Sequence, residues 1–92
     1  MDAGELERTL RERGYRNTFS WQDAPGACYP DHTHPADTAH IVLEGEITLI
    51  VGGQTRILKP SHAITDGDVP AGATHSARIG PDGCRYIVGS KE

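Results

Sequence analysis

The amino-acid sequence predicts a small all-β protein, an antiparallel barrel or sandwich with one short helix at its N-terminus. Three observations support this fold class. Short apolar segments recur along the chain, turn-forming glycines and prolines separate them, and most of the 11 glycines lie between these segments. Short strands at such regular spacing are typical of closed antiparallel barrels and sandwiches.

Length and charge limit the function classes. A chain of 92 residues is long enough for one domain, residues 1–92, with a modest core. The net charge of −4 and the lack of any Lys/Arg cluster exclude nucleic-acid binding. No apolar stretch is long enough to span a bilayer, and the charged N-terminal segment does not resemble a signal sequence. We therefore expect a cytoplasmic protein without a membrane partner, with reduced thiols at Cys28 and Cys84.

The first predicted element is a helix over residues 4–13. Asp2 is followed three residues later by a glutamate, which is the capping-box pattern, and Gly14 closes the segment. Leu6 and Leu10 are four residues apart and share one face. Because so short a helix is marginal alone, this face is expected to pack on the body of the protein or on a second subunit.

The barrel is expected to cover residues 15–89. Its first strand, residues 15–22, alternates between apolar and polar side chains, which predicts a half-buried strand. The apolar side of this strand carries Tyr15, Phe19 and Trp21.

Apolar runs between turn signals predict the other strands, at residues 39–43, 47–51, 54–58, 75–79 and 84–88. Turns are expected at residues 44–46, 52–53 and 70–72, and a loop at residues 80–83. Residues 60–68 are expected to form a polar loop.

A pair of histidines precedes the second apolar run. His32 and His34 are two residues apart, and in an extended strand such residues project from the same face. A single histidine on an apolar face is usually a hydrogen-bonded core residue, but two on one face are a common way for a sheet to present metal ligands. His62 lies in the polar loop and is expected to be solvated.

Two segments resemble the motifs of the cupin superfamily. From His32 to Gly45 the sequence is similar to the first motif, H-x-H-x3-E-x6-G, and the run Pro-Ala-Gly-Ala-Thr-His at residues 70–75 is similar to the core of the second, P-x-G-x2-H. The motifs and the strands between them cover residues 32–75 in the family order. The resemblance implies a cupin-type (RmlC-like) jelly roll with a divalent metal inside the barrel.

The resemblance also implies a ligand set. His32, His34 and His75 match the histidines of the two motifs. The position of the family's glutamate ligand is occupied by Thr38, which cannot replace a carboxylate. His40 lies two residues further on the same strand face, so it is either an optional fourth ligand or a group that supports the ligands.

The donor types restrict the metal. Three or four imidazoles without a carboxylate suit Zn, Fe, Ni, Cu or Mn and do not suit Ca or Mg. This set does not decide between these divalent transition metals. Thr38 and Tyr86 are candidates to line the substrate pocket, although Tyr86 could instead fill the core.

The sequence favours two functions over a third, a protein-interaction or stress-related dimer with vestigial histidines, because the histidine placement is too regular for drift. One is a metalloenzyme that acts on a small polar or anionic metabolite, with dioxygenase-, isomerase-, decarboxylase- and lyase-type reactions all known among cupins. The other is a non-catalytic cupin that binds a sugar or another small molecule, with a structural metal or none. Small cupins commonly dimerise, so we expect a homodimer through the Leu6/Leu10 face or the Tyr15/Phe19/Trp21 strand.

Overall fold

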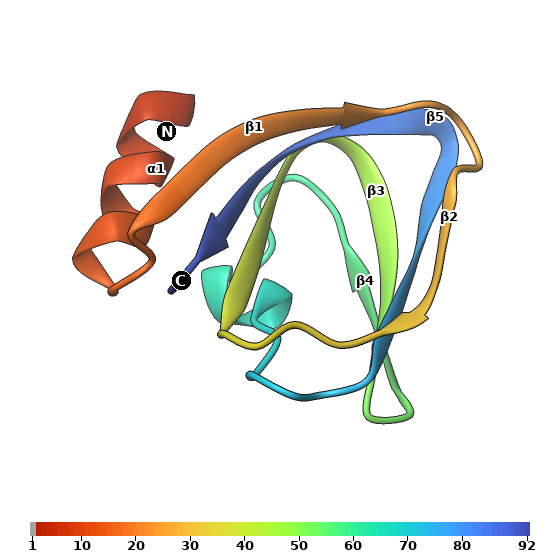
Figure 1. Ribbon diagram of the computed structural model, residues 1–92. Coiled ribbons are helices and arrows are strands. Elements are labelled where there is room, and N and C mark those ends of the chain that lie inside the picture. The colour runs from red at the N-terminus through yellow and green to blue at the C-terminus, as the bar shows by residue number, and fades with distance from the viewer. Residues whose placement is uncertain (1) are drawn as a thin grey trace.

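The computed structural model describes residues 2–92 and contains one helix packed against a single, strongly bent sheet (Figure 1). This confirms the predicted all-β fold with a short N-terminal helix. The elements, in chain order, are α1 (Ala3–Glu12), β1 (Asn17–Asp23), β2 (Cys28–His32), β3 (Thr38–Val51), β4 (Gln54–Leu58), the 3-10 helix η1 (Ile64–Gly67) and β5 (His75–Ser90). No helix in residues 2–92 is long and apolar enough to cross a membrane.

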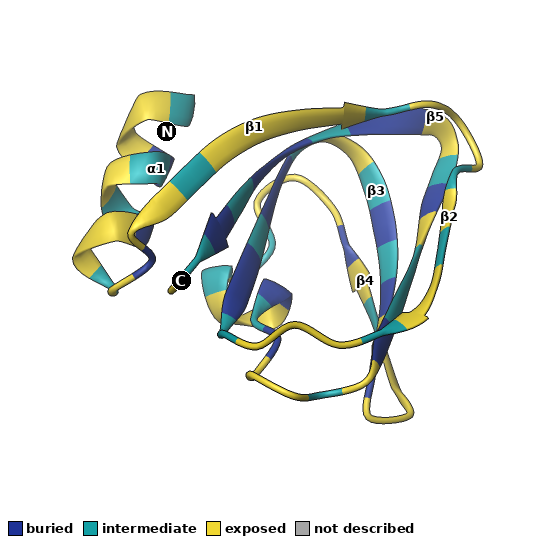
Figure 2. Cartoon of the chain, viewed as in Figure 1, coloured by how far each residue is buried: buried dark blue, intermediate teal, exposed yellow. Residues whose placement is uncertain are grey.

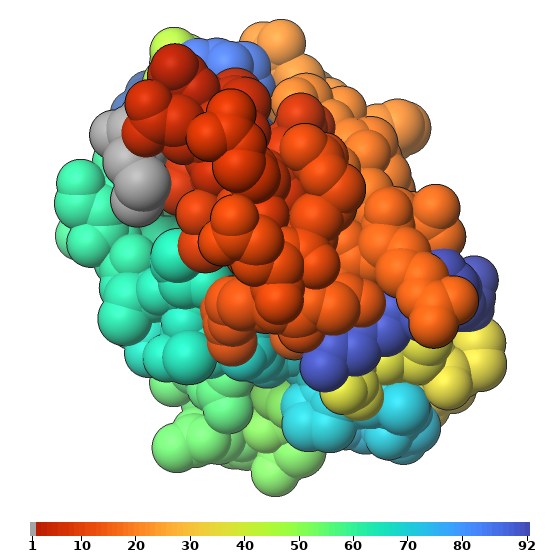
Figure 3. Space-filling view, turned by 90° about the vertical axis from the view of Figure 1, so that its left-hand side faces the viewer, coloured from red at the N-terminus to blue at the C-terminus, as the bar shows by residue number. Residues whose placement is uncertain are grey.

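Helix α1 begins where the capping pattern predicts. The Asp2 carboxylate accepts a hydrogen bond from the Glu5 N–H at 2.9 Å, so one of the free N–H groups of the first turn is satisfied. The apolar face of α1 is buried against its own chain, because Leu6 and Leu10 pack with Ile87 of β5. Figure 3 shows the helix spread over this side of the molecule. The Leu6/Leu10 face is therefore part of the core and is not free to form a subunit interface.

The two longest strands run through segments for which turns were expected. β3 and β5 pair antiparallel from Thr38 opposite Ser90 to Val51 opposite His75, but residues 80–83 of β5 have no partner in β3. The prediction of a turn at residues 44–46 is therefore wrong, and the loop expected at residues 80–83 is an unpaired bulge within β5. The register shifts on both sides of Gly45, and such bulges bend a strand without ending its ladder.

Gly45 allows this bend. It has a φ of +83°, which disfavours residues with a Cβ, and a Cβ at this position would collide with the backbone carbonyl of Gly83. The glycine that closes the first cupin-like motif is thus required by the close approach of the two bent strands.

The bent β5 strand positions the other strands. β1 pairs with its second half, from Asn17 opposite Ser90 to Asp23 opposite Cys84. β2 pairs with its first half and places His32 directly opposite His75. β4 returns from β3 and forms the far edge of the sheet.

Buried side chains form two groups, and Figure 2 shows buried positions along β3, β4 and β5. One lies between the two halves of the bent sheet and includes Leu49, Leu58 and Ile79. The other lies under α1 and includes Leu10 and Ile87. Of the two unpaired cysteines, Cys84 is buried and Cys28 is exposed.

The first strand differs from its prediction as a half-buried strand. Tyr15 precedes β1 and is buried, but Phe19 and Trp21 are 47% and 49% exposed. The reason is that β1 lies at the edge of the sheet, where its apolar side borders an open pocket instead of a closed core.

Candidate metal centre

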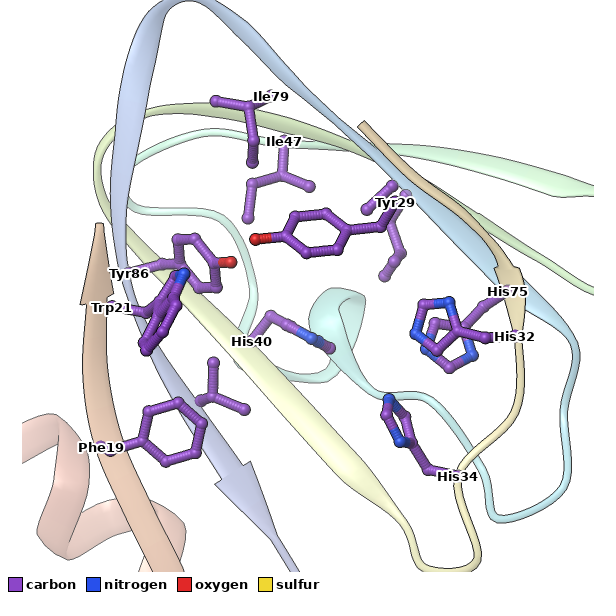
Figure 4. Close-up of a pocket in the computed structure, with 13 residues that line it drawn as sticks. Phe19, Trp21, Tyr29, His32, His34, His40, Ile47, His75, Ile79 and Tyr86 are labelled. Atoms are coloured by element: carbon purple, nitrogen blue, oxygen red, sulfur yellow. The ribbon is translucent and has the colours of Figure 1, made fainter. Parts of the chain in front are cut away.

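Three histidines from distant parts of the chain meet at one point. His32 ends β2, His34 follows two residues later, and His75 begins β5. Their candidate ligand nitrogens all lie within 4.8 Å of one another. The ring centroids are 4.1 Å apart for His32 and His75, and 4.8 Å and 5.0 Å from these two rings to His34. The direct pairing of β2 with β5 produces this convergence, which Figure 4 shows.

Backbone carbonyls orient two of these rings. The Nδ1 of His32 lies 2.7 Å from the Pro30 carbonyl oxygen, and the Nδ1 of His75 lies 3.1 Å from that of Ala73. A carbonyl oxygen only accepts, so each Nδ1 carries the hydrogen and, in the neutral ring, each Nε2 keeps its lone pair. This is the arrangement by which proteins commonly hold metal-binding imidazoles.

The third ring is also suited to metal binding. His34 is the most exposed of the three, yet partial desolvation of its ring lowers its pKa, and the nearby His75 and His32 lower it further. A lower pKa keeps the imidazole neutral near pH 7, which leaves a lone pair available. Three imidazoles without a carboxylate are a donor set for Zn, Fe, Ni, Cu or Mn, and leave room in the coordination sphere for a further ligand. Within residues 2–92 no other His, Cys, Asp or Glu cluster of this kind occurs.

His40 is close to this cluster but is not part of it. Its half-buried ring lines the same pocket from β3, and its Nδ1 donates to the Gly67 carbonyl at 3.0 Å. Burial lowers the pKa of His40. In Figure 4 the ring lies apart from the three clustered histidines, on the side of Tyr86.

His62 has a structural role, and the expectation that it is solvated is wrong. Its Nε2 accepts the Val42 N–H at 3.2 Å, and its Nδ1 donates to the Ala63 carbonyl at 2.7 Å. β4 pairs with β3 only from Ile47 onward, so the Val42 N–H has no partner strand at this edge. The imidazole supplies the missing acceptor.

The two residues expected to line the pocket differ in position. Tyr86 lines it, whereas Thr38 is buried outside the lining, with no hydrogen-bond partner for its hydroxyl. The pocket has a volume of about 290 Å³ and opens beside β1. It is lined by Phe19, Trp21, Tyr29, His32, His34, His40, Ile47, Leu49, His75, Ala77, Ile79, Tyr86 and Val88.

An aspartate that the sequence did not single out fixes the aromatic wall of the pocket. The Asp23 carboxylate accepts hydrogen bonds from the Tyr29 and Tyr86 hydroxyls, each at 2.6 Å, and from the Trp21 Nε1–H at 3.0 Å. The hydrogen bond to Asp23 raises the pKa of Tyr29, and burial together with Asp23 raises that of Tyr86. Both hydroxyls thus stay protonated and act as donors to Asp23.

Removing this carboxylate should cost stability. We expect Asp23→Ala to lower the free energy of unfolding by about 2–3 kcal/mol, because it leaves the part-buried Tyr29 and Tyr86 hydroxyls without their acceptor. Urea unfolding followed by circular dichroism measures the change. Asp82→Ala, at an exposed position in the bend of β5, is the control and should change stability by less than about 0.5 kcal/mol. Equal losses in the two variants would contradict the anchoring role.

Solved structures with similar folds include two enzymes. An RmlC-like cupin from Shewanella frigidimarina is 25% identical with a TM-score of 0.68, over 82% of this chain and 65% of that one. The DMSP lyase DddQ from Ruegeria pomeroyi is 25% identical with a TM-score of 0.69, over 82% and 37%. The polyketide cyclase RemF from Streptomyces resistomycificus is 29% identical with a TM-score of 0.65, over 82% and 54%. The chain therefore spans 37–65% of the length of these three proteins.

The sequence comparison is consistent with this fold. No protein with a curated description matches the sequence significantly. The family model of the cupin domain matches residues 19–88, a segment that contains all three clustered histidines and both strands that carry the bend. The match covers most of the chain and agrees with its jelly-roll topology. The chain is therefore a member of the cupin family.

Proposed function

We propose that this cupin is a metal-dependent enzyme that acts on a small metabolite with a polar or anionic oxygen-bearing group, through a lyase-, isomerase- or dioxygenase-type reaction. The observation that carries the proposal is the cluster of His32, His34 and His75 at the end of an open pocket. These three residues would hold a divalent transition metal. When bound, such a metal supplies a Lewis acid that polarises a substrate oxygen.

The oriented ligand rings and the open pocket support catalysis as well as metal binding. The Pro30 and Ala73 carbonyls preset two ligand rings, so little reordering is needed when the metal binds. The pocket opening leaves the cluster accessible to a small molecule. The lyase DddQ and the cyclase RemF are enzymes with similar folds, which favours a catalytic function over a purely structural one.

We assign His40 to the substrate rather than to the metal. Its Nδ1–H is held by the Gly67 carbonyl, so its Nε2 keeps a lone pair in the neutral ring. The burial that lowers its pKa keeps the ring neutral near pH 7. A neutral imidazole in a pocket wall can accept a hydrogen bond or a proton from a bound substrate.

The test uses untagged protein and two histidine variants. We expect the wild-type protein to bind close to one divalent transition metal per chain and to convert substrates from a panel of small carbonyl and carboxylate compounds. His40→Gln should keep the metal and lose at least about tenfold in turnover.

The control for the loss of an imidazole is His62→Gln, which lies outside the pocket. Its amide oxygen can still accept the Val42 N–H, so the variant should keep both the metal content and the turnover of the wild-type protein. A protein that binds no metal would refute the proposal. A protein that binds metal and ligands without turnover would favour the non-catalytic binding function.

A further inference from the structure

Apart from its histidines, the pocket is walled by apolar and aromatic side chains. Among residues 2–92, no Lys, Arg, Asp or Glu lines it. In Figure 4 the wall across the pocket from the three-histidine cluster includes Phe19, Trp21, Ile47 and Ile79. An anionic group in this pocket would therefore have a metal held by the three histidines as its positive partner.

The two tyrosines add little polarity to this wall. The hydroxyl hydrogens of Tyr29 and Tyr86 are both committed to Asp23, at 2.6 Å each. Their rings remain as pocket surface, while their donors are used within the protein. Polar partners for a ligand are thus concentrated among the histidines.

We infer that the ligand of this pocket is an amphipathic small molecule, with one carboxylate or similar oxygen-bearing head at the three-histidine cluster and an apolar, preferably aromatic, body along the Phe19–Trp21 wall. The assignment of the head rests on the proposed function. The apolar body restricts the class of substrate for that function, because a sugar or a hydroxy acid would lose hydration along the apolar wall without gaining hydrogen bonds.

The dimensions of the pocket agree with one small molecule. Apolar cavities of ~150 Å³ in other proteins can bind one benzene molecule. The volume of this pocket, about 290 Å³, is roughly twice as large, so one ring with a short acidic arm fits. Phe19 and Trp21 meet edge to face at the mouth, with centroids 6.1 Å apart, and each is about half exposed. A bound ring would cover both side chains, and a cavity of this size that ends on a metal-binding cluster suits a small molecule better than a segment of another chain.

The chain contains a built-in reporter for this test. Trp21 is the one tryptophan of the sequence and it lines the pocket, so its fluorescence reports occupancy directly. Protein loaded with Co²⁺ is titrated with acetate, butanoate, 3-phenylpropanoate and the polyhydroxylated gluconate. We expect the dissociation constant to fall about fourfold for each buried CH₂. It should be at least about a hundredfold lower for 3-phenylpropanoate than for acetate, with gluconate no tighter than acetate.

Two variants locate the effect. Phe19→Ser should weaken 3-phenylpropanoate binding by about tenfold and leave acetate unchanged. Ile57→Ser removes an apolar side chain that is 59% exposed and outside the pocket, and it should change neither.

The outcomes separate this inference from the proposed function. Failure to bind Co²⁺, seen by its visible absorption, would overturn the proposed function. If the dissociation constant still falls as the apolar part of the ligand lengthens in metal-free protein, the role of the apolar wall would remain supported. Equal affinities for acetate, 3-phenylpropanoate and gluconate on Co²⁺-loaded protein would overturn the inference and leave the metal centre intact. A Trp21 fluorescence spectrum that shifts with protein concentration in the absence of ligand would indicate that the Phe19–Trp21 wall contacts another copy of the chain. This result would also overturn the inference.

Discussion

Protein in which His34 is replaced by alanine is expected to purify without its divalent metal. The change leaves two imidazoles to hold the metal. Because removal of a group that only supports a metal ligand commonly lowers metal affinity about 10–100-fold, removal of a ligand itself should lower it by more than about a hundredfold. Folding should be retained, because His34 is exposed and lies in the segment between β2 and β3. The metal-to-protein ratio of untagged protein, measured by plasma mass spectrometry, gives the result, and thermal unfolding confirms the fold.

His40→Gln is the matched control for this experiment. It removes an imidazole from the same pocket but outside the three-histidine cluster, and it should keep the wild-type metal content. Full metal content in His34→Ala would show that the ligand assignment is wrong. Loss of metal in both variants would make His40 a fourth ligand.

Gly45→Ala is expected to be the most destabilising single-methyl change in the chain. The left-handed backbone at φ +83° costs about 1–2 kcal/mol for an L-residue, and the collision of the new Cβ with the Gly83 carbonyl adds about 1–3 kcal/mol. A total near 3 kcal/mol is a large share of the ~5–15 kcal/mol stability of a typical domain. It should lower the melting temperature by about 10–20 °C, and calorimetry measures this directly.

Gly53→Ala separates the two contributions. Gly53 has almost the same backbone angle, φ +82°, but no atom lies within 4 Å of the Cβ that alanine would add. Its cost should therefore be limited to the backbone strain, about 1–2 kcal/mol. Equal losses in the two variants would contradict the close approach of β3 and β5 at Gly45 and Gly83.

The sequence predicts local features of this protein well. The Asp2 cap and the Leu6/Leu10 face of α1 follow from spacing alone, and the two-residue spacing of His32 and His34 places both rings in one cluster. His75 required the second motif, because nothing local links it to residues 43 positions away in the chain. Its pairing with His32 is a property of the sheet.

Features that depend on pairing between distant segments were not predictable in the same way. A glycine-rich segment can form a turn or a bulge, and the pairing with the partner strand decides between them. Gly45 lies opposite Cys84 in a bulged ladder, close to the Gly83 carbonyl. The same holds for side chains that hydrogen-bond across the fold. Asp23 meets Tyr86 from 63 residues away, and His62 serves the Val42 N–H because β4 ends short of it.

The most direct test of the three-histidine metal centre is anomalous diffraction, at the absorption edge of the bound metal, from a crystal of untagged protein. We expect one strong peak in the space between His32, His34 and His75, with about 2.0–2.3 Å from the metal to a ring nitrogen of each. A peak at another site, or metal-loaded crystals with no peak among these three rings, would contradict the metal centre on which the proposed function depends.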